Sequence, residues 1–161
     1  MTVMLREQLA DDLKSAMKSK DTCCVSTLRL ILAALKDRDI AARSQGGNDH
    51  FGHETDDGSI QEMLAKMVKQ RRESISAYES GGRNDLAERE AAEIVIIENY
   101  LPHQLDENEI ARAVQGVIEK LGSNCIKDMG RTMAALKTAY SGQMDFSKAS
   151  NLVKEYLTSA R

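Results

Sequence analysis

The chain has 161 residues and a formal net charge of −3, with one proline, no tryptophan and 4% aromatic residues. This composition is typical of a helical protein with a core of aliphatic residues and methionine, and it argues against a β-sandwich. A chain of this length can bury about two-thirds of its unfolded surface, so the fold needs neither a metal nor disulfides. The three cysteines, an odd number with Cys23 and Cys24 adjacent, are expected to be free thiols.

A first amphipathic helix is expected from about Val3 to Lys18, because leucines recur there at helical spacing. Arg6 and Glu7 interrupt the apolar run that a signal peptide would need. No apolar stretch of the sequence approaches the ~20 residues that span a membrane. The sequence therefore predicts a cytoplasmic protein that does not enter a membrane.

A second helix is expected from Thr22 to about Arg43, with Asp21 as its N-cap. Apolar residues cover nearly all of its faces, which predicts a helix buried between others. Arg29 is the exception, and its guanidinium must pair with a carboxylate or reach the surface along its aliphatic stem. Cys23 and Cys24 lie near the helix N-terminus, where the dipole lowers the pKa of a thiol, so a nucleophile is conceivable, although packing is the favoured role.

The stretch from Ser44 to Gly58 contains four glycines among polar residues and has no periodicity, which predicts a long loop. Its side chains of the types that bind metals are His50, His53, Glu54, Asp56 and Asp57. A glycine-rich loop does not supply the rigid support that a metal site needs. We therefore favour a solvated acidic connector and predict no metal.

A third helix is expected to open with a capping box at Ser59 to Glu62 and to end at Gly81-Gly82, which would reverse the chain into an antiparallel hairpin. Counting outward from this turn, Arg71 lies level with Glu90 and Glu93. Because Arg71 and Glu90 each interrupt an apolar stripe, we predict a partly buried ion pair that fixes how the two helices dock. A catalytic role for the same residues is the less favoured alternative.

The fourth helix is expected to begin with a cap at Asp85 that is answered by Glu88. Its run from Ile94 to Ile97 is apolar on every face, so this turn should be buried. Pro102, the only proline, ends the helix, and Asp106 to Glu109 repeats the capping pattern. The residues after the proline are therefore expected to form a separate packing unit.

The predicted fold class is all-α: an N-terminal helical domain, residues 1–101, with a long antiparallel hairpin, followed by a small three-helix tail domain, residues 102–161. Gly122 and Gly142 are expected at the breaks between the tail helices. Gly130 falls inside a helix, where glycine costs about 1 kcal/mol relative to alanine. It therefore suggests the close approach of another backbone or of a ligand.

Several short segments carry a resemblance to a known family. They are Thr27-Leu28-Arg29-Leu30 with Ala33-Ala34-Leu35-Lys36, Lys69-Gln70-Arg71-Arg72-Glu73-Ser74-Ile75, Gly82-Arg83-Asn84-Asp85-Leu86-Ala87, Glu93-Ile94 with Tyr100-Leu101-Pro102, Lys127-Asp128-Met129-Gly130-Arg131-Thr132-Met133 and Val153-Lys154-Glu155-Tyr156-Leu157. In this order and spacing they make the chain resemble the YqeY-like proteins almost from end to end. The tail of that family is similar to the helical tail of the B subunit of the glutamine-dependent aminoacyl-tRNA amidotransferase.

The resemblance implies a role for the tail, because the similar domain of the amidotransferase is implicated in contacting tRNA. Residues 102–161 hold 8 Lys and Arg against 7 Asp and Glu, so their charge alone describes ordinary solvated helix faces. Such side chains can still contact a few phosphates. The RNA-binding surface that the resemblance implies includes Lys127, Gly130 and Arg131, with Lys148 and Lys154 as weaker candidates.

Conventional catalytic patterns are missing from the sequence, including phosphate-binding glycine loops, paired-cysteine motifs and the signatures of zinc proteases and serine hydrolases. The amidotransferase B subunit resembles this chain only in its tail, and its catalytic domain has no counterpart here. We therefore discount the family label of a carbon-nitrogen ligase with glutamine as amido-N-donor. His103, beside Pro102, is expected to make a polar contact between domains rather than to act as a base.

These observations predict a non-catalytic RNA-binding accessory protein without a cofactor, whose partner is tRNA or tRNA-linked protein machinery. Two alternatives remain open. One is a protein-protein interaction adaptor that uses the apolar edges near Pro102 and the loop from Ser44 to Gly58. The other is a metal- or thiol-dependent enzyme.

Overall fold

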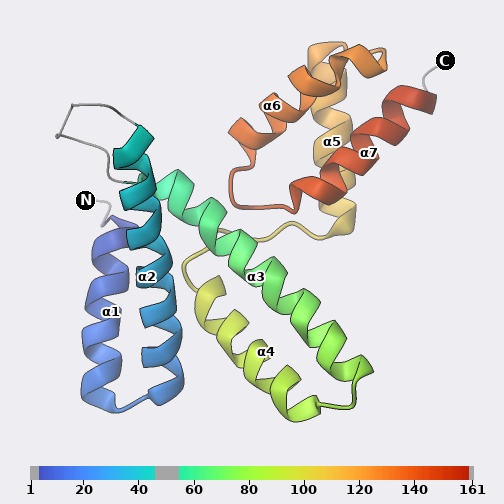
Figure 1. Cartoon of the computed structure of the whole chain (residues 1–161). Helices are drawn as coiled ribbons and strands as arrows, with labels where there is room; N and C mark the ends of the chain where they lie inside the picture. Colours follow the sequence, from blue (N-terminus) through green and yellow to red (C-terminus); the bar gives the residue numbers. More distant parts are fainter. Residues whose placement is uncertain (1–3, 46–54, 160–161) are drawn as a thin grey trace. The chain divides into compact units, whose positions relative to one another are not determined.

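The computed structural model describes residues 4–45 and 55–159, and every regular element in those ranges is helical (Figure 1). The elements are α1 (Leu5–Ser19), α2 (Thr22–Gln45), α3 (Asp57–Ser80), α4 (Asn84–Glu98), α5 (Glu107–Leu121), the short 3-10 helix η1 (Ile126–Asp128), α6 (Met129–Ala139) and α7 (Phe146–Ser159). The all-α prediction is confirmed. The chain divides into two compact units, Met1–Leu101 and Pro102–Arg161, which we call the first unit and the tail unit.

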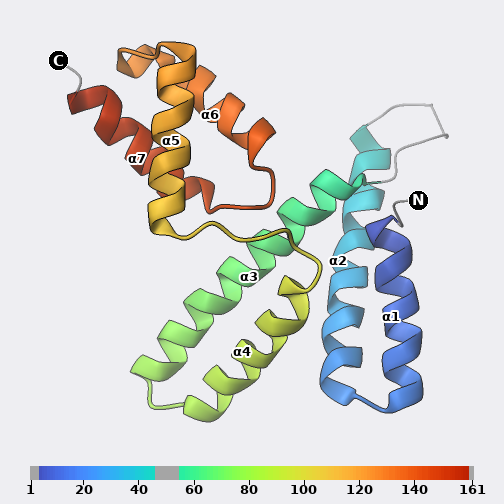
Figure 2. The ribbon, with the colours of Figure 1, turned by 180° about the vertical axis from the view of Figure 1, so that it is seen from behind.

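The first unit pairs its helices as two hairpins, α1 with α2 and α3 with α4, whose members lie side by side in both views (Figure 1 and Figure 2). Gly82, with a φ of 74°, allows the reversal between α3 and α4 that the sequence predicted. Leucine and isoleucine side chains form the core, and the completely buried ones are Leu9, Leu28, Ile31, Ile60, Leu64 and Ile97. Burial of this apolar surface holds the four helices together.

Two of the predicted helix caps are present. The side chain of Asp21 accepts a hydrogen bond from the backbone N–H of Cys24 at 3.1 Å, at the start of α2. Asp106 and Glu109 form a complete capping box at the start of α5, with both hydrogen bonds at 2.8 Å. Each cap supplies acceptors for backbone N–H groups that have no partner within the helix.

Two other predicted caps are wrong. α3 begins earlier than expected, because Asp56 Oδ1 accepts from the backbone N–H of Ser59 at 2.7 Å and so acts as the N-cap. The connection between α2 and α3 is correspondingly shorter than the predicted loop from Ser44 to Gly58. At the start of α4 there is no side-chain cap, because the carboxylate of Asp85 pairs instead with the guanidinium of Arg83, with Nε and Oδ1 3.1 Å apart.

The structure also corrects two expectations about burial. α2 is not buried on all faces: it packs against α1, α3 and α4, but Leu30 and Ile40 are 51% and 53% exposed, so one face stays uncovered. Arg29 is exposed, so of its two expected solutions it takes the one at the surface. In α4, Ile94 is buried but Val95 is 63% exposed, so that turn has one free face.

A hydrogen-bonded cluster that the sequence did not reveal ties the beginning of α1 to the end of α2. Arg6 forms a two-pronged pair with Asp39, with Nη1 to Oδ2 at 2.8 Å and Nη2 to Oδ1 at 3.0 Å. The backbone N–H and the hydroxyl of Thr55 also donate to Asp39 Oδ1, at 3.0 and 2.7 Å. These donors, the Arg6 guanidinium above all, hold the pKa of the Asp39 carboxyl well below its usual range.

The tail unit packs α5, α6 and α7 around a second apolar core, whose completely buried members are Val114, Leu136, Ala149 and Val153. Gly122 ends α5 with a φ of 63°, and Gly142, with a φ of 72°, lies between α6 and α7, as the sequence predicted for both breaks. The segment before α5 joins this unit through the backbone N–H of Leu105, which donates to the carbonyl of Gln143 at 2.8 Å. Among the described helices of the chain, none is both long and apolar enough to cross a membrane.

Candidate nucleic-acid interface

The turn that leads into α6 is organised by Asp128. Its carboxylate accepts from the backbone N–H groups of Asn124 and Cys125, at 3.0 and 3.4 Å, and these hydrogen bonds, the one from Asn124 above all, lower the pKa of the Asp128 carboxyl. The buried hydroxyl of Thr132 donates to the Asp128 carbonyl and lies 2.9 Å from the hydroxyl of Ser123. This network fixes the backbone that carries the predicted RNA-binding residues Lys127 and Arg131. It also places a carboxylate at the helix start, so the side chains, not the free N–H groups of the helix, must bind any phosphate.

The two principal cations differ in their surroundings. Lys127, on η1, is exposed and forms no ion pair with another described residue. Arg131, on α6, is 52% exposed and pairs with Asp128 at 3.1 Å. Arg131 must therefore share or exchange this carboxylate when it contacts a phosphate.

Gly130 lies between these cations and is exposed. Apart from its own stretch of helix, no described atom lies within 4 Å of the position that a Cβ would take, so the expected close approach of another backbone is wrong among the described residues. The open space leaves room for a ligand to reach the helix surface between Lys127 and Arg131.

The two weaker candidates lie on α7. Lys148 Nζ is 3.4 Å from the carboxylate of Glu107, whereas Lys154 is exposed and has no ion pair within the described chain. α6 and α7 run antiparallel, and η1 packs against α7 (Figure 1 and Figure 2). The tail fold thus brings Lys127, Arg131 and Lys154 toward one end of the α6–α7 pair. Lys148 stands about 9 Å away from Lys154 along the helix axis, toward the other end.

The predicted ion pair of the first unit joins α3 to α4. Arg71 Nε lies 2.9 Å from Glu93 Oε2 and 4.0 Å from Glu90 Oε2, and the three side chains are 13%, 15% and 24% exposed. The remaining guanidinium edge donates to the Met67 carbonyl at 3.3 Å. The structure therefore brings together all three residues that counting from the turn had placed level. The N–H groups of Arg71 are thus directed at carboxylates of α4 and at a carbonyl of its own helix α3.

The cysteines give little support to thiol chemistry. Burial, followed by the nearby carboxylates of Asp21 and Asp12, raises the pKa of the Cys24 thiol, which reduces the thiolate that a nucleophile needs. Cys125 is exposed, and its thiol donates to Asp128 at 3.7 Å.

The residues that could have bound a metal divide into two groups. His50, His53 and Glu54 lie outside the described residues, and within the described ranges no three metal-binding side chains gather. Asp56 caps α3, and Asp57 Oδ1 accepts from the backbone N–H of Leu5 at 3.2 Å, so both carboxylates serve the fold. His103 lies 3.4 Å from Glu109 within the tail unit.

Comparison with known proteins finds relatives in several yeasts, each named "Altered inheritance of mitochondria protein 41, mitochondrial". The relative from Lachancea thermotolerans is 30% identical over 129 residues, which cover 80% of this chain and 62% of the relative. Those from Kluyveromyces lactis and Eremothecium gossypii are 36% and 37% identical, over 66% and 58% of this chain and 55% and 46% of theirs. The chain thus spans between about half and three-fifths of the length of these relatives.

The names of these relatives contradict the prediction of a cytoplasmic protein, since they describe mitochondrial proteins. That prediction rested on the charged residues Arg6 and Glu7 near the start of the sequence and on the lack of a long apolar stretch. Cellular addresses are carried by targeting segments that are no part of a fold, so a helical core shared with organellar proteins is a poor guide to location.

A family profile described as "Yqey-like protein" matches residues 6–157, which cover most of both units and contain the helices α2 to α6 completely. The match extends across the segments that carried the resemblance, from Thr27 in α2 to Leu157 in α7. The chain belongs to the YqeY-like protein family.

Proposed function

We propose that this protein is a non-catalytic RNA-binding accessory protein that contacts tRNA, or machinery that carries tRNA, through its tail unit. The observation that supports the proposal best is the exposed Gly130 between Lys127 and Arg131, where no described atom outside its own stretch of helix lies within 4 Å of a built Cβ. Two cations on either side of an unobstructed backbone suit a phosphate of an RNA strand. The family resemblance adds that a similar tail domain is implicated in contacting tRNA.

The charges of the tail unit favour modest, salt-sensitive affinity. Lys127 and Lys154 have no ion pair among the described residues, so their charges are available to phosphates, whereas Arg131 must compete with Asp128. Phosphate contacts of this kind gain affinity from counterion release and carry little sequence information. The surface therefore suits an accessory that binds many tRNAs alike.

The proposal assigns no reaction to the chain. The carbon-nitrogen ligase label belongs, by resemblance, to an enzyme whose catalytic domain has no counterpart in these helices. In the described residues the most buried ion pair, that of Arg71, serves helix docking, and the pKa of the Cys24 thiol is raised. These features suit binding rather than catalysis.

The test is a titration of the full chain with unfractionated tRNA at several salt concentrations. With roughly three or four phosphates neutralised, the logarithm of the binding constant should fall with the logarithm of salt at a slope of about −3. Replacing both Lys127→Glu and Arg131→Glu should flatten the slope and weaken binding to all tRNAs alike. The control is Lys66→Glu, which makes one such charge reversal at an exposed site on α3 and should leave the affinity nearly unchanged.

Two results would refute this function. One is no binding of tRNA even at low salt. The other is equal loss of affinity in the tail variant and in Lys66→Glu, which would show that the overall charge matters and not the tail surface.

A further inference from the structure

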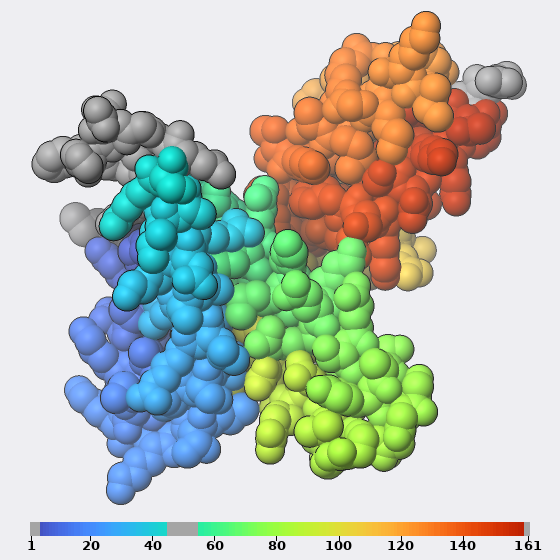
Figure 3. Space-filling model, in the orientation of Figure 1, coloured from blue at the N-terminus to red at the C-terminus, as the bar shows by residue number. Residues whose placement is uncertain are grey.

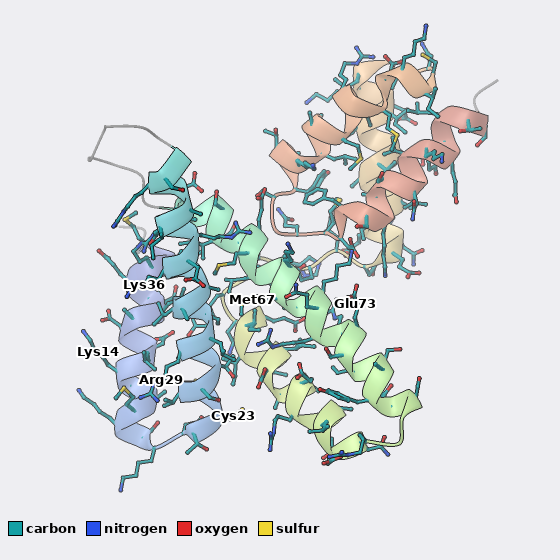
Figure 4. The ribbon with its side chains drawn as sticks, in the orientation of Figure 1. Lys14, Cys23, Arg29, Lys36, Met67 and Glu73 are labelled. Atoms are coloured by element: carbon teal, nitrogen blue, oxygen red, sulfur yellow. The ribbon has the colours of Figure 1, made fainter. Side chains whose placement is uncertain are left out.

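The outward face of α2 carries cations that the rest of the described structure leaves unpaired. Arg29, Lys36 and Arg43 are exposed and recur every seven residues, which separates them by about 20° around the helix and ~10 Å along it. Figure 4 labels Arg29 and Lys36 on this helix. None of the three forms an ion pair with another described residue, in contrast to Arg131 and Lys148 of the tail.

Apolar side chains accompany these cations. Leu30 and Ile40 are 51% and 53% exposed, and the exposed Ala33 lies between them on the outward face. The opposite side of the helix packs in the core through Leu28 and Ile31. α2 forms part of the front surface of the first unit in Figure 3. A single exposed leucine is ordinary, but here two large apolar side chains lie beside a row of cations that have no ion-pair partner among the described residues.

We infer that this face of α2 docks an amphipathic helix of a partner protein, one with acidic residues beside an apolar stripe. The heptad spacing of Arg29, Lys36 and Arg43 matches the spacing at which a packed helix presents the residues that flank its apolar seam. Glutamates at those flanking positions would pair with the cations, while the seam would cover Leu30 and Ile40. Both parts of the face are then used at once.

Other occupants leave part of the face unsatisfied. RNA phosphates would neutralise the cations, but they would leave the exposed side chains of Leu30 and Ile40 uncovered. A second copy packed two-fold on α2 would set Lys36 against Lys36 and Arg29 against Arg43, and like charges in contact are unfavourable. The inference concerns the first unit only, so it stands or falls separately from RNA binding by the tail.

The probe is a fluorescent helical peptide of about three heptads, with leucine at the seam positions and glutamate at the flanking ones. Titrated with the full chain, it should bind and release as salt rises. The double variant Arg29→Glu with Lys36→Glu should weaken binding at least tenfold, and Ile40→Ser severalfold without changing the salt dependence. Lys14→Glu makes the same kind of charge change on α1, at a side chain that is 74% exposed, and should keep the affinity within twofold.

Circular dichroism melting of each variant checks that it is folded; if the double reversal is not, Arg29→Gln with Lys36→Gln replaces it and should still weaken binding. The inference is overturned if the acidic peptide does not bind, or if a peptide with lysine in place of glutamate binds as well. It is also overturned if Lys14→Glu loses as much affinity as the double variant. Three further assays test other occupants of this face: binding of homopolymeric RNA, binding of phosphatidylserine vesicles, and sedimentation of the protein alone. If the peptide does not bind, but one of these ligands or a second copy does and is lost in Ile40→Ser or in the double variant, that occupant replaces the partner helix.

Discussion

The pair of Arg6 and Asp39 offers the sharpest test of the energetics of the first unit. The change Arg6→Met keeps the apolar stem of the side chain and removes the guanidinium. Among the described residues, it leaves the Asp39 carboxylate, 11% exposed, with only the two donors of Thr55. Removing one partner of a buried ion pair costs about 3–5 kcal/mol, and because Arg6 is 28% exposed we expect about 2–3 kcal/mol here.

The companion change Asp39→Asn tests the direction of the argument. It removes the charge opposite Arg6 but leaves one acceptor oxygen, and a partly exposed guanidinium can also turn to water, so the loss should be smaller, about 1–2 kcal/mol. Urea unfolding followed by circular dichroism measures both. The reasoning is refuted if Arg6→Met changes the free energy of unfolding by less than ~0.5 kcal/mol, within the range of ordinary surface substitutions.

The same pair makes the stability depend on pH in acid. Because the pKa of Asp39 is lowered in the folded protein, its contribution is complete above the ordinary carboxyl pKa near 4 and declines as the pH falls toward the lowered value. The deficit of Asp39→Asn relative to the unmodified protein should therefore shrink between pH 7 and pH 3, by about 1 kcal/mol. A deficit that is the same at both pH values would contradict the assignment.

Three further predictions concern other contacts. Arg71→Ala should lower the free energy of unfolding by about 2–4 kcal/mol, because it leaves two carboxylates facing each other. In the same urea assay Arg72→Ala, which removes a side chain that is 62% exposed, should cost less than ~1 kcal/mol. Equal losses in the two variants would mean that the Arg71 pair is not buried in solution. Burial raises the pKa of Tyr100, so the protein should lose stability as the pH rises above 10. Thermal melting at pH 8 and pH 11 measures this loss, which should be smaller in Tyr100→Phe. An equal loss in the variant would show that other groups cause it. Asp106→Ala should lower the free energy of unfolding by about 1 kcal/mol, because it removes a helix cap. Asp85→Ala should leave the stability nearly unchanged in the same assay. A larger effect of Asp85→Ala would support the cap that the sequence predicted at this residue.

Much of the fold follows from local patterns. The turn at Gly82 and the apolar stripes were enough to place Arg71 level with Glu93, because the register of a hairpin is counted from its turn. Asp106 and Asp85 show the limit of the same approach. Both precede a glutamate by three residues, yet only Asp106 caps a helix, because Arg83 occupies the carboxylate of Asp85. A capping pattern in the sequence shows that an aspartate can cap a helix, but neighbouring charges determine whether its carboxylate is free to do so.

Long-range contacts were beyond the sequence for a different reason. Arg6 and Asp39 are 33 residues apart and neither belongs to a recognisable motif, so no spacing rule connects them. The free face of α2 was missed because its apolar residues cover the whole circumference, and periodicity then gives no indication of which side meets the neighbouring helices. At the candidate interface the sequence and the family gave the residue types, but the competition of Asp128 for Arg131 required the structure.

The hydrogen bonds from Thr55 to Asp39 have a consequence for how the family can vary in length. They join two positions that bracket the connection from α2 to α3, 16 residues apart in sequence. With both ends held by the same carboxylate, inserting residues between them adds only loop-closure entropy, about 0.6 kcal/mol for each doubling of length. The helices on either side would keep their positions, so homologous chains can gain segments in this connection without disturbing the core of the first unit.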